Sequence, residues 1–358
     1  MPEASGGDYQ VSEGKTRATE VASRRVLVEE GGFARVHALI TGAGGFLGSA
    51  LVRALAAAGH RVRGMVRGRL PAAPPVPGVE WVQGDVNDAA STSRAVSGVD
   101  VVFHLAGIRR APVREAFLRV NAEGTRQVCD ASWRSGVRRL VLAGSLAAVG
   151  PSRPDRPHVE ADPFAPEEWY GESKAEAERI AFAHAGKLEV TVARPPRILG
   201  PGDRENLVFF KLIRRGIRLV VGGGPRPLSV VDVDDVVAFL LLLAEHPRAP
   251  GEAFFCPGPE TTTLEDIQDR GARVLGVSPR TVHLSPGVLR TLAAGADVVS
   301  RITGHNLPLN RKLARQLLAP AWTCSGEKAA ERLGWRARVP VHDSIARSAA
   351  WYQAQGWL

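Results

Sequence analysis

A tyrosine and a lysine four residues apart are the strongest chemical signal in the sequence. Tyr170 precedes Lys174 in an Ala- and Glu-rich run that is typical of a helix and continues to about residue 185. Side chains at this spacing lie one turn apart on the same helix face. A nearby ammonium favours the phenolate form of a tyrosine, so the pair can exchange protons near neutral pH. The alternative is an exposed surface pair, but neither Tyr9 nor Tyr352 has a lysine at this spacing. We therefore predict that Tyr170 is a catalytic acid or base.

A serine follows a short apolar run upstream of this helix. Residues 140–143 (Leu-Val-Leu-Ala) are predicted to form a strand, and Ser145 comes two residues after it. Where parallel strands alternate with helices, the ligand crevice lies at the carboxyl ends of the strands. A hydroxyl there can hydrogen-bond a substrate oxygen while Tyr170 transfers the proton. The alternative role for Ser145 is to cap the segment that follows it.

A glycine-rich segment joins the first predicted strand to the first predicted helix. The strand covers residues 36–40, and the helical pattern runs from Phe46 to Ala58. Glycines at this joint permit a tight turn and let the backbone approach a pyrophosphate, whose charge the free helix amides attract. A plain glycine-rich turn is the alternative, but its position favours a dinucleotide site. The predicted contact residues are Gly42, Gly45, Phe46, Leu47 and Gly48.

The residues after the second and third predicted strands bear on the form of the dinucleotide. The second strand ends at Arg67 with no carboxylate nearby. A carboxylate at this point would bind a ribose 2′-hydroxyl, whereas a guanidinium suits a 2′-phosphate. We therefore expect NADP(H) in preference to NAD(H), although a surface arginine is the alternative in so Arg-rich a chain. Asp85, after the third strand, is a candidate for the adenine amine or for capping the next helix.

The elements that must position these residues alternate regularly. Further strands are predicted at 60–67, 80–83, 99–105 and 189–193, with a helix from about 121 to 136. This alternation predicts an α/β fold, a doubly wound parallel-sheet Rossmann domain with helices on both faces.

The alternation breaks down after residue 202, which suggests a second part of the chain. We predict a Rossmann domain over 35–200, to which 231–255 return, and a smaller C-terminal mixed substrate lobe over 201–230 and 256–358. Residues 1–34 are polar and charged without a sustained period. They are predicted to be a disordered extension, or translated sequence upstream of the true start.

Composition excludes several classes of protein. The formal net charge is +9, but the arginines are scattered and form no basic stripe with aromatics, which argues against nucleic-acid binding. The 3 cysteines are far apart, so we expect no disulfide framework, no metal site and a reducing, cytoplasmic location. The longest apolar run, Val236–Ala244, is too short to span a membrane, and the N-terminus lacks an apolar signal core.

Several motifs recur in an order that resembles a known family. They are Thr41-Gly42-x-x-Gly45-x-x-Gly48, Gly84-Asp85-Val86, His104-Leu105-Ala106-Gly107, Val120-Asn121-x-x-Gly124-Thr125, Ser145 with Val149-Gly150, Tyr170-x-x-Ser173-Lys174, Arg194-Pro195-x-x-Ile198-Leu199-Gly200-Pro201 and Val233-Asp234-Asp235-Val236. Together they cover about residues 36–357. The chain resembles the extended short-chain dehydrogenase/reductase superfamily, also called the NAD-dependent epimerase/dehydratase family.

The resemblance implies functions for individual residues. It implies a Ser145–Tyr170–Lys174 triad, with Tyr170 and Lys174 also contacting the cofactor, and hydride transfer to or from nicotinamide. The other cofactor contacts that it implies are Val86, Leu105, Ala106, Gly107, Pro195 and Ile198. Gly144 and Asp232 depart from the family pattern, and both departures are expected to change substrate contacts. Relatives often form a homodimer through helices near 121–135 and 169–185.

Three reactions are compatible with these motifs. The Tyr170-to-Glu178 segment and the Leu333-Gly334-Trp335 ending resemble the dihydroflavonol-reductase and 3β-hydroxysteroid-dehydrogenase-like branch. We therefore expect reversible carbonyl reduction or alcohol oxidation on a medium-sized apolar or aromatic small molecule. A nucleotide-sugar epimerase or dehydratase is the alternative, although dehydration would typically need an acidic residue near Ser145, and residues 144–149 contain none. A non-catalytic NADP(H)-sensing protein would have no need of the triad.

Overall fold

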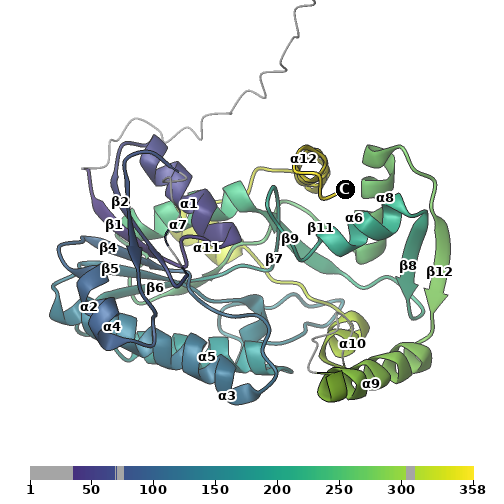
Figure 1. Cartoon of the computed structure of the whole chain (residues 1–358), viewed down its shortest axis with the longest axis horizontal. Helices are drawn as coiled ribbons and strands as arrows, with labels where there is room; N and C mark the ends of the chain where they lie inside the picture. Colours follow the sequence, from purple (N-terminus) through teal and green to yellow (C-terminus); the bar gives the residue numbers. More distant parts are fainter. Residues whose placement is uncertain (1–34, 69, 71–75, 304–310) are drawn as a thin grey trace, which may run out of the picture. The chain divides into compact units, whose positions relative to one another are not determined.

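Seven strands form the central sheet of the computed structural model, which describes residues 35–68, 70, 76–303 and 311–358. The strands lie in the order β10-β6-β5-β4-β1-β2-β3 and every neighbouring pair is parallel (Figure 1). Their bounds are β1 His37–Thr41, β2 Arg61–Val66, β3 Val79–Gln83, β4 Val101–His104, β5 Arg139–Ala143, β6 Glu189–Arg194 and β10 Ala253–Phe255. The predicted α/β fold with a parallel sheet is confirmed. The extension predicted over 1–34 lies outside the described residues.

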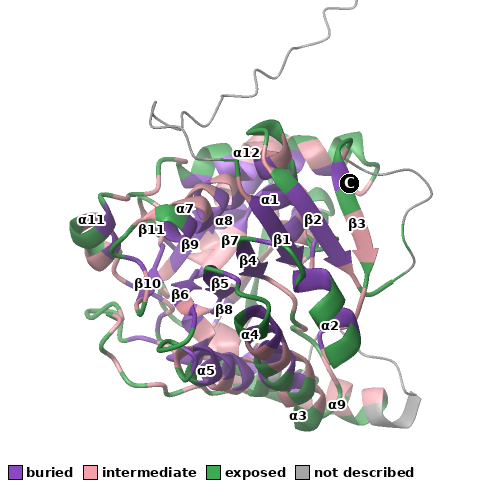
Figure 2. Ribbon diagram, turned by 90° about the vertical axis from the view of Figure 1, so that its left-hand side faces the viewer, coloured by how far each residue is buried: buried purple, intermediate pink, exposed green. Residues whose placement is uncertain are grey.

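Helices cover both faces of the sheet because successive side chains along a strand point to opposite faces. In β1, Ala38 and Ile40 share one core cluster with α1 (Phe46–Ala57) and α7 (Val233–Glu245). Leu39 belongs to a second cluster on the other face. That cluster contains residues of α2 (Ala89–Val96), α4 (Gly124–Arg134) and α5 (Trp169–Phe182). Figure 2 shows β1 as a buried strand between these layers, as expected when a parallel sheet is covered twice.

The helix predicted to begin near Asn121 begins earlier and contains an irregular turn. It starts with α3 (Arg114–Phe117) and continues through a π-helical segment, η1 (Leu118–Glu123), into α4. The Gly124 N–H bonds the carbonyl of Arg119, five residues back, where an α-helix would use four. This wider turn has no signature in hydrophobic periodicity, and it contains the buried Asn121.

Residues beyond β6 form two smaller sheets. β7 (Arg197–Leu199) pairs with β9 (Leu228–Asp232), which also pairs with β11 (Thr261–Thr262), and β8 (Ile217–Val221) pairs with β12 (Arg280–Leu284). The remaining elements are η2 Leu146–Ala148, α6 Leu207–Arg214, α8 Leu264–Leu275, α9 Pro286–Thr303, α10 Arg311–Leu318, α11 Glu327–Leu333 and α12 Val341–Ala354. Ala34–Leu358 form one compact unit, so the boundaries of a separate C-terminal lobe stay a prediction. Within the described part of the chain, no helix is long and apolar enough to cross a membrane.

Candidate active site

The strand order reverses between β1 and β4, and the segments that follow the central strands meet at this edge of the sheet. β1 connects through α1 to β2 on one side, whereas β4 connects to β5 on the other. Such a reversal opens a crevice at the carboxyl ends of the strands. The candidate residues follow four neighbouring strands: residues 42–48 after β1, 105–107 after β4, Ser145 after β5 and Pro195 after β6.

Lys174 is anchored to the end of β5. Its side chain projects from α5, is 6% exposed, and its Nζ donates a hydrogen bond to the carbonyl oxygen of Ala143 at 2.7 Å. Burial lowers the pKa of Lys174; Tyr170 opposes this shift and Arg109 adds to it. A buried ammonium held by a strand end is fixed in position, which a lysine on an exposed helix face would not be.

Tyr170 and Ser145 are carried by two elements in close contact, the first turn of α5 and the residues that begin η2. A Cβ at Gly171 would overlap the carbonyl oxygen of Ala147, so glycine is required for the helix to approach this turn. Ser145 has an extended backbone, φ −169°, and its Oγ accepts a hydrogen bond from the Ala147 N–H at 3.1 Å. The serine is therefore a cap, and its hydroxyl proton remains available to another acceptor. The structure brings Ser145, Tyr170 and Lys174 to one end of the sheet.

A buried hydrogen-bond chain runs beneath these residues, through Ala106, Thr41, His104, Thr125 and Asn121. The Ala106 N–H donates to Thr41 Oγ1 (3.2 Å), which is 2.7 Å from His104 Nδ1. His104 Nε2 is 3.0 Å from Thr125 Oγ1, which donates its own proton to the Asn121 carbonyl (2.6 Å). Because the Thr125 hydroxyl donates its proton to the Asn121 carbonyl, it can only accept from His104. Nε2 therefore carries the hydrogen, and Nδ1 accepts a hydrogen bond from Thr41. Burial, followed by the charge of Lys174, lowers the pKa of His104 to about 3.

Asn121 connects this chain to the start of α5. Its Oδ1 accepts from the Ile108 N–H (2.7 Å), and its Nδ2 donates to the Ile108 carbonyl (3.0 Å) and to Ser173 Oγ (2.9 Å). Ser173 Oγ in turn donates to the backbone carbonyl of Tyr170 at 2.8 Å. The family motifs contained Asn121, His104 and Thr125, but the sequence did not indicate that they form one connected support.

The glycine segment makes a close backbone contact with the loop after β4. Gly42 has φ +71°, and a Cβ there would lie 2.9 Å from the Ala106 nitrogen. A Cβ at Gly48 would overlap the Gly42 carbonyl oxygen. Gly45 is the N-cap of α1 and has no side chain that could cap the helix. The backbone amides of Phe46, Leu47 and Gly48 therefore donate no hydrogen bond to a capping side chain. Free amides at a helix start suit an anionic group.

The residues after β2 and β3 lie further along the same edge. Arg67 is exposed directly after β2 and, among the described residues, has no ion-pair partner. Asp85 Oδ1 accepts from the N–H and the Nδ2 of Asn87, at 2.9 and 3.0 Å. The cap of α2 is Asp88, which accepts from two helix amides, so the alternative that Asp85 caps this helix was wrong. Val86 is buried and packs where a Cβ at Gly124 would touch it.

The residues after β4 and β6 make backbone contacts with the end of β1 and the start of η2. Leu105 N–H bonds the Thr41 carbonyl (3.3 Å), and a Cβ at Gly107 would lie 3.5 Å from Lys174 Nζ. The Pro195 carbonyl accepts from the Leu146 N–H at 3.1 Å, and Ile198 lies in β7.

Both departures from the family pattern have structural explanations. At Gly144, a Cβ would lie 2.8 Å from Val192 Cγ1 and 3.0 Å from the Ala193 carbonyl, so packing against β6 requires glycine. Asp232 is 2% exposed, caps α7 through the Asp234 N–H and pairs with Arg347 at 2.5 Å. These contacts give Gly144 and Asp232 roles in packing and capping.

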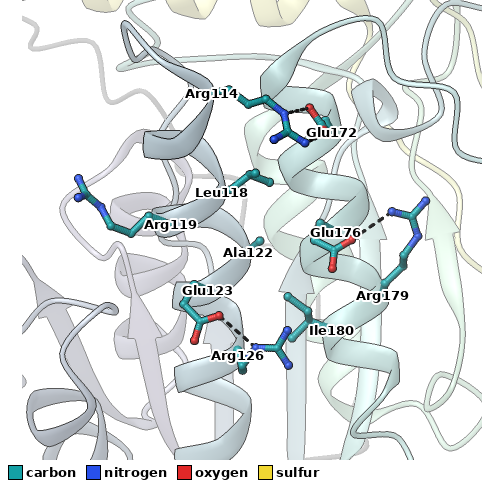
Figure 3. A pocket seen from close by; sticks show the side chains of 10 residues that line it. All are labelled: Arg114, Leu118, Arg119, Ala122, Glu123, Arg126, Glu172, Glu176, Arg179 and Ile180. Atoms are coloured by element: carbon teal, nitrogen blue, oxygen red, sulfur yellow. Dashed lines mark hydrogen bonds and ion pairs between the residues drawn. The ribbon is translucent and has the colours of Figure 1, made fainter.

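A separate groove lies between the outer surfaces of α3, η1, α4 and α5, away from the strand ends. Figure 3 shows the side chains that line it, and the ion pair Arg114–Glu172 joins α3 to α5 across the groove. The pairs Arg126–Glu123 and Arg179–Glu176 each lie within one helical segment, and Arg119 and Arg179 extend outward. Its polar groups are largely neutralised by one another. The groove contains none of the residues predicted to do chemistry.

Comparison with known proteins agrees with this geometry. The model of the NAD dependent epimerase/dehydratase family matches residues 38–255. A ceramide reductase of Caulobacter vibrioides is 34% identical over 91% of this chain and 97% of its own length. A 2-alkyl-3-oxoalkanoate reductase of Stenotrophomonas maltophilia is 30% identical over 86% and 97%. The solved structure of MoeE5 in complex with UDP-glucose and NAD is 25% identical, covers 89% of this chain and 99% of that one, and has a TM-score of 0.71.

Proposed function

The chain belongs to the NAD-dependent epimerase/dehydratase family, and on that premise we propose that it reduces a carbonyl, or oxidises the matching alcohol, through Ser145, Tyr170 and Lys174. The observation that carries this proposal is the position of Lys174: a buried ammonium, bonded to the end of β5, one helical turn from Tyr170. Two relatives named as reductases support carbonyl reduction. Their names also support a substrate with a long apolar part.

The residues present fit a nicotinamide dinucleotide. The uncapped amides of residues 46–48 would hold the pyrophosphate, and glycine at 42 and 48 keeps that segment free of Cβ atoms that would overlap the backbone. Lys174 would hold the nicotinamide ribose, and residues 195–198 would contact the nicotinamide. When bound, this cofactor supplies or accepts the hydride at the substrate's reacting carbon.

Three side chains would divide the remaining work. In the reductive direction, Tyr170 donates a proton to the carbonyl oxygen as that oxygen gains charge. Ser145 accepts from the Ala147 N–H and so directs its own hydroxyl proton towards the same substrate oxygen. The ammonium of Lys174 stabilises the phenolate left on Tyr170. In the oxidative direction the proton moves from the alcohol to Tyr170.

Replacing Tyr170 tests the central step. Tyr170→Phe keeps the ring and removes the proton donor, so kcat is expected to fall about 10²–10⁴-fold, the usual contribution of a positioned acid, with little change in the dissociation constant for NADPH. Lys174→Met should lower kcat as well. Lys187→Met is the matched control, because this exposed lysine contacts Trp133 beyond the end of α5. Retention of turnover in Tyr170→Phe would contradict the assignment.

We further infer a preference for NADP(H), supported by Arg67, which is exposed after β2 and pairs with no acidic side chain among the residues that the structure describes. Arg67→Asp should weaken NADPH binding far more than NADH binding, because only NADPH has a 2′-phosphate for a guanidinium to contact. Arg94→Asp makes the same charge change on the exposed face of α2 and should affect neither. Equal weakening of both dinucleotides would refute the preference.

A nucleotide-sugar epimerase or dehydratase is the second candidate, favoured by the similarity to a structure that holds UDP-glucose. The absence of a carboxylate from residues 144–149 argues against the dehydratase form. A homodimer through η1, α4 and α5 is a further proposal, supported by the open groove of Figure 3. Sedimentation at micromolar concentration tests it, and a monomer throughout would refute it.

A further inference from the structure

Arg109 places a positive charge beside the proposed proton donor. It lies in the loop after β4, and its Cζ lies over the Tyr170 ring, 5.7 Å from the ring centroid. Its side chain is exposed and, in the described part of the chain, takes part in no hydrogen bond or ion pair. A guanidinium next to the reacting position therefore has no fixed anionic partner.

Arg197, the first residue of β7, carries a second guanidinium. Its Nη1 donates to Asn206 Oδ1 at 2.6 Å, and its Cζ lies 6.0 Å from the Phe209 ring centroid. No carboxylate of the described residues forms an ion pair with it. Arg110, next to Arg109, pairs with Glu205 at 2.8 Å, and Glu205 directly precedes the Asn206 that Arg197 bonds, so these contacts link the two arginine-bearing segments. Burial lowers the pKa of Arg197 and Arg109 adds to this shift, whereas Asp203 and Glu205 oppose it. Arg197 is partly exposed, and Nη1 is the only one of its guanidinium nitrogens with a hydrogen bond to a described residue.

The carboxylates of this region are already engaged. Glu205 bonds Arg110 at 2.8 Å, which joins the loop after β4 to the loop that carries Asn206. Asp203 Oδ1 accepts from the Glu205 N–H at 2.8 Å and Oδ2 from the Asn206 N–H at 3.2 Å, inside its own turn. Against the effect of burial, the charge of Tyr170, followed by those of Glu205, Asp203 and Glu168, raises the pKa of Arg109. Neither Glu205 nor Asp203 forms an ion pair with Arg109 in the described part of the chain.

We propose that Arg109 and Arg197 bind a carboxylate that lies within a few bonds of the carbonyl reduced at Tyr170, so that the substrate is a 3-oxo acid with an apolar chain. This inference rests on the function proposed above. Two guanidiniums that form no ion pair with any described residue match the two oxygens of a carboxylate, and its negative charge relieves their mutual repulsion. Phe209, 8% exposed, packs against Arg197 and supports its guanidinium. The apolar chain follows from the proposed function and the names of the two reductase relatives. In turnover the carboxylate keeps its charge; the carbonyl carbon gains the hydride and its oxygen gains the Tyr170 proton.

The test compares three alcohols that share a carbon chain, assayed in the oxidative direction with NADP⁺ and with NAD⁺. They are 3-hydroxyoctanoate, its methyl ester, and 2-heptanol, which lacks the carboxyl group. The parent enzyme should prefer the acid by about ten-fold or more in kcat/KM, the effect of charge-assisted hydrogen bonds. Arg109→Gln and Arg197→Gln should each remove most of that preference, chiefly through KM, and leave the ester within about two-fold. Arg134→Gln is the matched control, an exposed arginine at the last turn of α4.

Equal losses on all three alcohols, or a parent that prefers the ester, would overturn the proposal. The proposal would also fail if Arg109→Gln and Arg197→Gln weakened only dinucleotide binding, because the arginines would then contact the cofactor. It would fail likewise if both variants weakened UDP-glucose binding as much as they weakened activity on the acid. If no alcohol is oxidised, the proposed function fails. A binding measurement then tests separately whether Arg109 and Arg197 form a carboxylate site. Octanoate should then bind the NADPH complex about ten-fold more tightly than octanamide, and Arg197→Gln should abolish the difference. Equal binding of the two would refute the subsite.

Discussion

Lowering the pH from 7.5 to 5.0 should destabilise the protein through His104 in particular. The imidazole is 1% exposed, and both ring nitrogens are occupied, one by Thr41 and one by Thr125. Its pKa in the folded chain is about 3, against 6.5 in the unfolded chain. Above pH 6.5 both states are neutral and the contribution of this residue is fully present. Below 6.5 the unfolded chain binds a proton that the folded chain does not, so stability is lost.

The size of this loss follows from the two pKa values. At pH 5.0 the imidazole is still neutral in the folded chain, but in the unfolded chain the pH lies about 1.5 units below its pKa, so it is protonated there. Each unit corresponds to about 1.4 kcal/mol, so the free energy of unfolding falls by about 2 kcal/mol. Other titrating groups also change stability over this range, so the parent is compared with His104→Asn. The parent should lose about 2 kcal/mol more than the variant between the two pH values, even though the variant is less stable at both.

Urea denaturation followed by tryptophan fluorescence gives the free energies at each pH. His283→Gln is the control, because His283 is exposed on β12 and its replacement should leave the pH dependence of the parent unchanged. The ring proton resonance of His104 provides a measurement that needs no variant, and it should not shift down to pH 5. A pH dependence identical in parent and His104→Asn, or a resonance that titrates near pH 6.5, would refute the argument.

Two further contacts predict changes in stability. Glu178→Gln removes the charge that Glu178 places against the buried Arg194, so the free energy of unfolding should fall by about 3–5 kcal/mol. The same change at the half-exposed Glu176 is the control and should cost less than about 1 kcal/mol. Similar losses in both variants would contradict this reasoning. Tyr352→Phe removes the hydrogen bond from its hydroxyl to the Asp203 carbonyl, 2.6 Å long, and should cost about 1–3 kcal/mol in urea denaturation; an unchanged midpoint would show that water replaces it.

Sequence reasoning located the elements whose residues repeat with a fixed period. Ala38, Leu39 and Ile40 alternate between two cores, and such short apolar runs between helices predicted the sheet and its covering layers. The pairing of Tyr170 and Lys174 could be predicted for the same reason, because their spacing is about one helical turn. Periodicity reports which face of an element is buried, and a doubly covered sheet follows from it.

Contacts between distant segments could not be predicted in this way. Asn121 lies in a π-helical turn, which contains one residue more than an α-helical turn. Hydrophobic periodicity does not reveal such an extra residue. Arg109 and Arg197 are 88 positions apart and have no distinguishing neighbours in an Arg-rich chain. The fold links their segments through the Arg110–Glu205 pair and the Arg197–Asn206 hydrogen bond. Gly144 requires glycine because of β6, which the local sequence does not reveal.

The bond between Tyr352 and Asp203 has a consequence for biosynthesis. Asp203 leaves the ribosome 149 residues before Tyr352. At usual elongation rates, this interval lasts on the order of ten seconds. Strands β1 to β6 can therefore pair before the Tyr352 hydroxyl reaches the Asp203 carbonyl, whereas β10 and the bond itself must wait for later parts of the chain.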